Sequence, residues 1–179
     1  MFCLEARSPN TAKNFVVNQK KPLIGAAAIA AGFAFKKSYD GPVFDSKGVD
    51  LTGKTIVITG ANTGLGKESA LSLAGMGMPE VILLCRNAEK AQAAVDDIKA
   101  RTKNPNIRYI LCDLADLKSV KSAADQVKKS VSRVDILQLN SGVMAIPERE
   151  TTKDGFEKHM GINHLGHFAL TSYLFEVLL

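Results

Sequence analysis

The stretch TGANTGLGKE, Thr59–Glu68, follows directly on the apolar run TIVI of residues 55–58. A short apolar run that ends in a glycine cluster indicates a strand turning sharply into a helix. Gly60 permits the tight turn, Gly64 lets the backbone approach a ligand, and Gly66 lets the new helix pack closely on the strand. The N–H groups at the start of that helix suit a pyrophosphate, because the helix dipole is positive there. The alternative is a glycine-rich turn that binds no ligand.

Short apolar runs alternate with amphipathic stretches from Leu51 onward, which predicts repeated βαβ units. The strands are expected at 55–59, 81–85, 107–112 and 134–139. The run Val81–Cys85 is apolar at every position, as is typical of a parallel strand that helices cover on both faces. Helices are expected over 64–77, from the N-cap Asn87 to just before Asn104, over 116–132 and over 154–179. The pattern therefore predicts an α/β fold with a buried parallel sheet.

Length and composition allow one globular core and an extension, since the chain has 179 residues of which 46% are hydrophobic. We expect residues 51–179 to form the nucleotide-binding domain and residues 1–50 to form a separate segment with a linker. The net charge of +5 is moderate, and the lysines lie beside acidic residues, which argues against nucleic acid as a partner. Cys3, Cys85 and Cys112 are too few and too far apart for a disulfide framework or a zinc motif, so a reducing compartment is expected.

The N-terminal segment contains an unbroken run of small apolar residues, Pro22–Phe35, with two lysines on each side. It is shorter than the stretch of about 20 apolar residues that spans a bilayer. Basic flanks around such a run suit a signal sequence, a membrane-inserted anchor or an organelle-targeting sequence. We therefore expect membrane contact through Pro22–Phe35, or import into the endoplasmic reticulum, a plastid or a mitochondrion. A flexible arm on a cytoplasmic protein is the alternative.

The motifs downstream of Leu51 resemble the short-chain dehydrogenase/reductase family, and most of all its retinol-dehydrogenase-like branch. The glycines are spaced Gly-x3-Gly-x-Gly rather than Gly-x-Gly-x-x-Gly, and the resemblance extends to Leu179. The segments that carry it are TGANTGLG at 59–66, LCRN at 84–87, CDL at 112–114, NSGVM at 140–144 and GINHLGHF at 161–168. The resemblance implies a Rossmann-like sheet in the order 3-2-1-4, truncated after the fourth strand and its following helix.

The resemblance also implies a role for each matched position. The cofactor's pyrophosphate would lie at the glycine-rich turn, Asp113 and Leu114 would contact the adenine, and Asn140 to Gly142 the nicotinamide-side ribose. The cofactor-binding residues would be Gly60, Asn62, Thr63, Gly64, Leu65, Gly66, Arg86, Asp113, Leu114, Asn140, Ser141 and Gly142. Asn163 would be the catalytic asparagine that supports an ordered water in a proton relay. Leu139 replaces an asparagine that ties neighbouring strands together in the family, so lower local stability is expected there.

The residue after the second strand decides which nucleotide is expected. NAD-specific relatives place an acidic side chain there, which accepts hydrogen bonds from the ribose hydroxyls. This chain has Arg86 at that place. Because a guanidinium pairs with a 2′-phosphate and no carboxylate repels it, we expect the cofactor NADP(H). The alternative is a solvated arginine with no ligand.

Hydride transfer in this family uses a tyrosine four residues before a lysine, with a serine upstream. Tyr39, Tyr109 and Tyr173 are followed at that spacing by Val43, Asp113 and Val177. We therefore expect a truncated chain, inactive alone, from an NADP(H)-dependent oxidoreductase acting on a lipophilic alcohol or carbonyl compound. The alternative is a non-catalytic NADP-binding protein that ends naturally at Leu179. The last expected helix is apolar around much of its surface, which predicts poor stability alone or a homo-oligomer through that helix.

Two further groups of residues, the histidines and two of the cysteines, could carry chemistry. His159, His164 and His167 share the last expected helix, but no Asp or Cys stands near them at ligand spacing, so no metal site is expected. Cys85 and Cys112 end neighbouring strands, and we expect them to be buried free thiols rather than a redox pair.

Overall fold

The computed structural model describes residues 31–32, 35 and 48–178. The chain divides into two units, Met1–Lys47 and Gly48–Leu179, and the fold described below is that of the second. The segment Pro22–Phe35, which is expected to contact a membrane or to direct import, lies almost entirely outside the described residues. Within the part of the chain that is described, no helix is both long and apolar enough to cross a membrane.

The core of the second unit is a parallel sheet. Its strands are β1 (Thr55–Thr59), β2 (Glu80–Cys85), β3 (Ile107–Leu111) and β4 (Ile136–Gln138), in the spatial order β3-β2-β1-β4. The expected order 3-2-1-4 is confirmed. Val81–Cys85 is buried along its whole length, so the central strand does carry apolar side chains on both faces.

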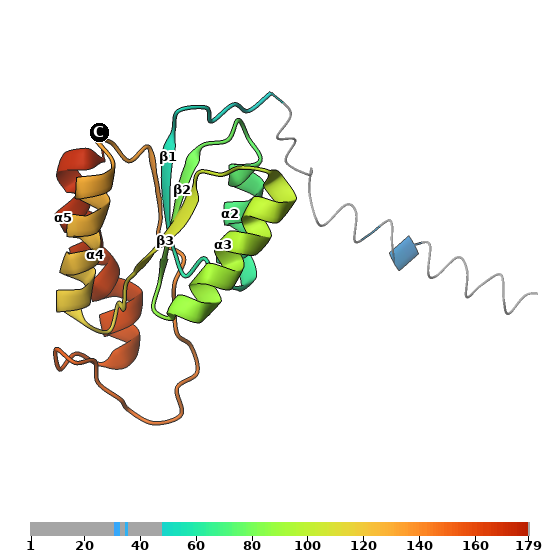
Figure 1. Cartoon of the computed structure of the whole chain (residues 1–179). Helices are drawn as coiled ribbons and strands as arrows, with labels where there is room; N and C mark the ends of the chain where they lie inside the picture. The colour runs from blue at the N-terminus through green and yellow to red at the C-terminus, as the bar shows by residue number, and fades with distance from the viewer. Residues whose placement is uncertain (1–30, 33–34, 36–47, 179) are drawn as a thin grey trace, which may run out of the picture. The chain divides into compact units, whose positions relative to one another are not determined.

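Helices cover both faces of the sheet (Figure 1). Helices α2 (Gly64–Ala74) and α3 (Ala88–Thr102) lie on one face, and α4 (Leu117–Ser130) and α5 (His167–Leu174) lie on the other. Side chains alternate between these layers along each strand. Ile56 and Ile58 pack with α2 and α3, whereas Val57 packs with α4 and α5. This three-layer arrangement places the ends of the strands, rather than their faces, at the surface.

The link from α3 to β3 is held by a buried asparagine that the sequence marked only as a helix terminator. The Asn104 amide nitrogen donates to the carbonyl oxygens of Ala74 and Pro79, at 3.1 and 2.9 Å. Its oxygen accepts the N–H of Asn106 at 2.8 Å. Asn104 is fully buried, so these bonds tie the end of α2 and the start of β2 to the loop before β3.

Replacing Asn104 by aspartate keeps the shape but removes both donated bonds and turns a carboxylate toward two carbonyl oxygens. We expect Asn104→Asp to lower the free energy of unfolding by about 2–5 kcal/mol, measured by urea denaturation of the full chain. Asn106→Asp is the matched control, because the Asn106 amide donates to the Met78 oxygen from an exposed position at 3.3 Å. Its expected loss is below about 1 kcal/mol, and equal losses in the two variants would contradict the assigned role of Asn104.

Strand β4 is shorter than the expected 134–139. The Val134 N–H bonds to the Val177 oxygen at the end of the last helix, at 2.6 Å, rather than to a strand. Beyond Gln138, the Asn140 N–H bonds to the Thr59 hydroxyl at 2.9 Å, so a side chain replaces the strand ladder. Leu139 is 44% exposed, and its expected effect on local stability stays a prediction.

The last helix begins later than the expected Asp154. Residues 151–157 form a tight loop in which the Asp154 carboxylate accepts the Leu117 N–H at 2.8 Å. The Glu157 carboxylate then accepts the N–H groups of Met160 and His159, which lowers the Glu157 pKa to about 2. Glu157 therefore caps the helix. A π-helical turn (Met160–Gly166), α5 and a short 3₁₀ turn (Phe175–Val177) follow.

One side of this last helical region is apolar and exposed. Leu170 and Leu174 are fully buried against α4, but Phe168 and Phe175 are each 65% exposed and Met160 is 54% exposed. This agrees with the expectation that apolar surface remains uncovered. Self-association through it stays a prediction.

Candidate functional site

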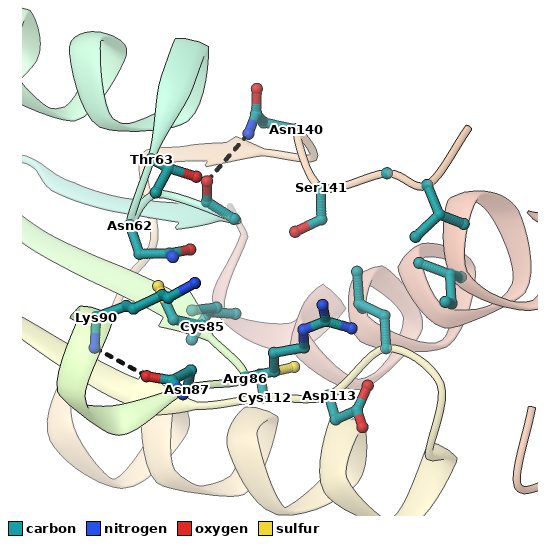
Figure 2. Close-up of a pocket in the computed structure, with 16 residues that line it drawn as sticks. Asn62, Thr63, Cys85, Arg86, Asn87, Lys90, Cys112, Asp113, Asn140 and Ser141 are labelled. Atoms are coloured by element: carbon teal, nitrogen blue, oxygen red, sulfur yellow. Dashed lines mark hydrogen bonds between the residues drawn. The ribbon is translucent and has the colours of Figure 1, made fainter. Parts of the chain in front are cut away.

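A crevice of about 480 Å³ opens where the carboxyl ends of the strands meet. In doubly wound sheets ligands bind at this edge, where connections leave a central strand in opposite directions. β1 lies between β2 and β4, so this crevice occupies that position. Its walls are Gly60, Asn62, Thr63, Leu84, Cys85, Arg86, Asn87, Lys90, Cys112, Asp113, Leu114, Asn140, Ser141, Gly142, Val143 and Ile162 (Figure 2).

The glycine-rich turn has the geometry that its sequence predicts. Gly60 has a φ of +65°, a left-handed conformation that favours glycine. A Cβ added to Gly66 would lie 2.5 Å from the Gly60 oxygen, so only glycine allows α2 to pack this closely on the end of β1. Gly64 has a φ of +56°, which also favours glycine, and a Cβ added there would meet open space.

The start of α2 has no side-chain cap. Thr63 stands at the N-cap position without a capping bond, and the first turn carries no acidic residue. In α3 and α4 the same position is filled by Asn87 and Asp116, whose side chains accept N–H groups of the first turn. The first N–H groups of a helix have no partner within the helix. Those of α2 therefore suit an anion bound beside Gly64 and Leu65.

Two cationic side chains line the opposite wall. Arg86 follows β2 directly and Lys90 lies in the first turn of α3, and both point toward the opening between Asn62 and Ser141 (Figure 2). Both are exposed, and within residues 48–178 neither forms an ion pair, unlike Arg101 and Arg108. Sequence reasoning missed Lys90. Its position in the first turn of the helix expected after the N-cap Asn87 was the available signal.

The loop after β4 forms a shelf, which we define as Asn140–Gly142. Thr59 anchors it, because its hydroxyl accepts the N–H groups of Asn140 and Ser141 at 2.9 and 3.0 Å. The Asn140 amide nitrogen donates back to the carbonyl oxygens of Thr59 and Gly60, at 3.0 and 3.4 Å, and the latter bond is drawn in Figure 2. The shelf is therefore held against the glycine-rich turn, with the Ser141 side chain facing the crevice.

The turn after β3 completes the wall. Asp113 shapes it, since its carboxylate accepts the Ala115 N–H at 3.0 Å and its own N–H bonds to the Ser119 hydroxyl at 3.0 Å. Leu114 is 6% exposed and belongs to the core on the α4 side of the sheet. The turn after β3 thus places the Asp113 carboxylate beside the apolar Leu114 in the wall of the crevice.

Asn163 does not line the crevice. Its side chain clamps Val143, accepting the Val143 N–H at 2.8 Å and donating to the Val143 oxygen at 2.9 Å. Asn163 lies in the π-helical turn, a distortion that is frequent at functional sites. Both ends of its amide hold the loop after the shelf, and the expected catalytic role of Asn163 stays a prediction.

The two thiols of the crevice are buried and free. Burial raises the pKa of Cys85 from 9.0 to about 11 and that of Cys112 to about 12, so neither is a thiolate at neutral pH. They belong to core clusters on opposite faces of the sheet. The expectation of inert thiols agrees with this arrangement.

The three histidines lie in separate surroundings. His159 bonds to Glu157 and His164 stacks on Phe168 with ring centroids 6.5 Å apart. His167 is buried against Thr59. Across the described part of the chain, no cluster of three or more potential metal ligands occurs.

Most of the predicted cofactor residues are therefore neighbours in space. Gly64, Leu65 and Gly66 belong to the start of α2 at the rim, and Leu65 is 83% exposed. Asn163 is not among the residues that line the crevice and bonds to Val143 instead. The others line the crevice itself: Gly60, Asn62, Thr63, Arg86, Asp113, Leu114, Asn140, Ser141 and Gly142.

Comparison with known proteins identifies the family of the chain. The short chain dehydrogenase family profile matches residues 54–179. Human retinol dehydrogenase 13 is 44% identical over 158 residues, which cover 88% of this chain and 47% of that protein. The chain thus spans about half the length of such relatives.

Solved structures share the fold. A protein of Mycobacterium paratuberculosis superposes with a TM-score of 0.65 at 40% identity, covering 76% of this chain and 47% of that one. A metagenomic short-chain oxidoreductase in complex with NADP gives a TM-score of 0.62 at 25% identity, covering 71% of this chain and 57% of that one. With its glycine-rich turn, its sheet order and these relatives, the chain belongs to the short-chain dehydrogenase family of oxidoreductases, in the retinol-dehydrogenase-like branch.

Proposed function

We propose that the crevice binds NADP(H), and that the protein takes part in hydride transfer between this cofactor and a lipophilic alcohol or carbonyl compound. The proposal rests on two cations, Arg86 and Lys90, that line the crevice and have no ion-pair partner within residues 48–178. Across the crevice lies the start of α2, which has no side-chain cap. A nucleotide with both a pyrophosphate and a 2′-phosphate matches these two anion-binding features at once.

The pyrophosphate would lie at the start of α2. The N–H groups there lack a side-chain cap, and the helix N-terminus carries roughly half a positive charge. Gly66 keeps that helix close to the end of β1, so a ligand at the rim meets backbone rather than side chains.

The 2′-phosphate would lie between Arg86 and Lys90. Arginine binds phosphate through two parallel hydrogen bonds, and lysine adds a point charge. Asp113 is the acidic residue among those that line the crevice, and it lies after β3 rather than after β2, where NAD-specific relatives carry theirs. One similar solved structure holds NADP, which supports this choice.

The nicotinamide half would rest on the shelf, where NADPH supplies a hydride when bound. The chain's tyrosines do not supply the family's proton donor, since none is followed by lysine four residues later. Tyr109 and Tyr173 also lie away from the crevice lining. We therefore expect the 179-residue chain alone to bind NADP(H) without turnover.

A lipophilic substrate is proposed because human retinol dehydrogenase 13 is a relative at 44% identity. The loop that follows the shelf supports it with an apolar side chain, since Met144 is 89% exposed just beyond Val143. The second candidate function is a non-catalytic NADP-binding protein. Sequencing the transcript beyond the codon for Leu179 separates the two, because a downstream Tyr-x-x-x-Lys would support the enzyme.

The test of the proposed function is a fluorescence titration of the full chain with NADPH and NADH. NADPH should bind at least roughly tenfold more tightly, as expected when one charge-assisted contact is made only by the 2′-phosphate. Equal affinities, or no binding of either, would overturn the proposal. Adding all-trans-retinal to the NADPH complex should cause no oxidation of NADPH. Measurable turnover would contradict the expected inactivity of this chain.

We propose that Pro22–Phe35, with its flanking lysines, directs the protein to a membrane or an organelle. A fluorescent reporter fused after residues 1–40 should then collect on membranes or in one organelle of a cell. Replacing the four flanking lysines by glutamate is the control and should disperse the reporter. A native fusion that fills the cytosol evenly would count against targeting.

A further inference from the structure

The hydroxyl of Thr59, at the end of β1, has a fully determined set of hydrogen bonds. It accepts the N–H groups of Asn140 and Ser141 at 2.9 and 3.0 Å, and it lies 3.0 Å from the Nε2 atom of His167. A hydroxyl has two lone pairs and one proton. With both lone pairs engaged by N–H donors, the Thr59 proton has one remaining direction, toward His167.

This arrangement defines the protonation of the imidazole. Because Nε2 accepts the Thr59 proton, His167 carries its own proton on Nδ1, which lies 3.1 Å from the Asn163 carbonyl oxygen. Burial also lowers the pKa of His167, with the bond to the Asn163 carbonyl opposing the shift, so the neutral form fits the site. In the described residues no buried side-chain nitrogen or oxygen lacks a hydrogen-bond partner.

The same hydroxyl controls the position of the shelf. Thr59 is 1% exposed and His167 is 6% exposed, so water does not replace either partner without moving the backbone. The shelf also has little room on its other side, since a Cβ on Gly60 would lie 2.5 Å from the Ser141 hydroxyl. If the Thr59 proton turned from His167 toward either N–H donor, that donor would lose its acceptor, and Asn140 and Ser141 would shift relative to the glycine-rich turn.

We infer that His167 is a positioning residue for the nicotinamide half of the cofactor. It aligns the Thr59 hydroxyl to hold the shelf, and through its other nitrogen it holds the Asn163 carbonyl. Asn163 in turn clamps Val143, the residue directly after the shelf. The imidazole thus braces both sides of the loop without touching the crevice. This inference rests on the proposed binding of NADP(H).

A positioning residue should affect binding of one half of the nucleotide. A merely structural residue should affect both halves. Arg86 and Lys90 lie on the other wall and are expected to keep their positions when His167 is replaced. Loss of the imidazole should therefore weaken binding of the complete dinucleotide. It should leave unchanged the binding of adenosine 2′,5′-bisphosphate, which has the 2′-phosphate but no nicotinamide half.

The experiment compares His167→Phe with His167→Gln, since glutamine keeps an acceptor for the Thr59 hydroxyl and phenylalanine does not. His167→Phe should lower NADPH affinity roughly tenfold while affinity for the bisphosphate changes less than about twofold. His167→Gln should restore most of the NADPH affinity. Thr59→Val and Thr59→Ser provide a second matched pair. Only Thr59→Val should lose NADPH affinity, because serine keeps the hydroxyl. A parallel loss of both ligands, or unchanged NADPH binding by folded His167→Phe, would overturn the inference.

Failure of the proposed function would appear as wild-type protein that binds neither NADPH nor the bisphosphate. Two further measurements test the role of His167 without any nucleotide. Nitrogen NMR of the full chain should show His167 with its proton on Nδ1 alone at neutral pH, with exposed His164 as the internal comparison. A proton on Nε2 would contradict the network. Amide exchange at Asn140 and Ser141 should be roughly tenfold faster in His167→Phe than in the wild type, and equal rates would also overturn the inference.

Discussion

Replacing Gly66 by alanine is expected to damage both the fold and nucleotide binding. A Cβ at this position would lie 2.5 Å from the Gly60 oxygen and 2.5 Å from the Asn140 amide nitrogen. The asparagine side chain has some freedom, but the Gly60 oxygen belongs to the turn itself and moves only if α2 withdraws from β1. We expect Gly66→Ala to lower the free energy of unfolding by about 1–3 kcal/mol, measured by urea denaturation.

The same displacement carries the N–H groups of α2 away from the rim of the crevice, so NADPH binding should fall below detection. Gly75→Ala at the other end of α2 is the control. Its added Cβ would meet atoms no closer than 3.6 Å, and its φ of −80° suits alanine. This control should be neutral or more stable by up to about 1 kcal/mol. Similar behaviour of the two variants would show that close packing at Gly66 is not required.

Replacing Arg86 by aspartate is expected to reverse the nucleotide preference. The substitution removes a charge-assisted contact with the 2′-phosphate, worth about 1.5–3 kcal/mol, and places a carboxylate where NAD-specific relatives have one. NADPH affinity should fall about 10- to 150-fold, whereas NADH affinity should stay the same or rise. Fluorescence titration with each nucleotide measures both changes.

Two further variants, Lys90→Gln and Arg101→Asp, serve as comparisons for Arg86→Asp. Lys90→Gln should weaken NADPH binding less than Arg86→Asp does, because lysine supplies a point charge rather than a paired contact. Arg101→Asp makes the same charge change on α3 outside the crevice, next to Asp97. It should leave the NADPH to NADH ratio unchanged. An equal change of that ratio in Arg101→Asp would mean that net charge, not a 2′-phosphate site, sets the preference.

The strands and the glycine-rich turn could be predicted because their signals are local. Thr55–Thr59 has the expected bounds, since a buried apolar run ends where Gly60 forces a left-handed turn. The order of the strands came from the family resemblance. The placement of Arg86 followed from the end of β2, because parallel strands bring their carboxyl ends to one edge.

Other features depended on contacts between distant residues and could not be read from local pattern. β4 ends early because the Thr59 hydroxyl, far away in sequence, takes the Asn140 N–H. The last helix starts late because Asp154 bonds to the first turn of α4 and Glu157 becomes the cap. The clamp of Asn163 on Val143 and the burial of His167 against Thr59 also join separate elements.

The most direct test of NADP(H) binding at this crevice is an amide NMR titration of the full chain with NADPH. The largest shift changes should fall on Gly60, Asn62, Thr63, Arg86 and Ser141, and NADH should leave Arg86 much less affected. The second groove of the domain, lined by Thr52, Lys99 and Arg108 at the opposite end of the strands, should stay unchanged. Shift changes confined to that groove, or none at saturating NADPH, would contradict the account.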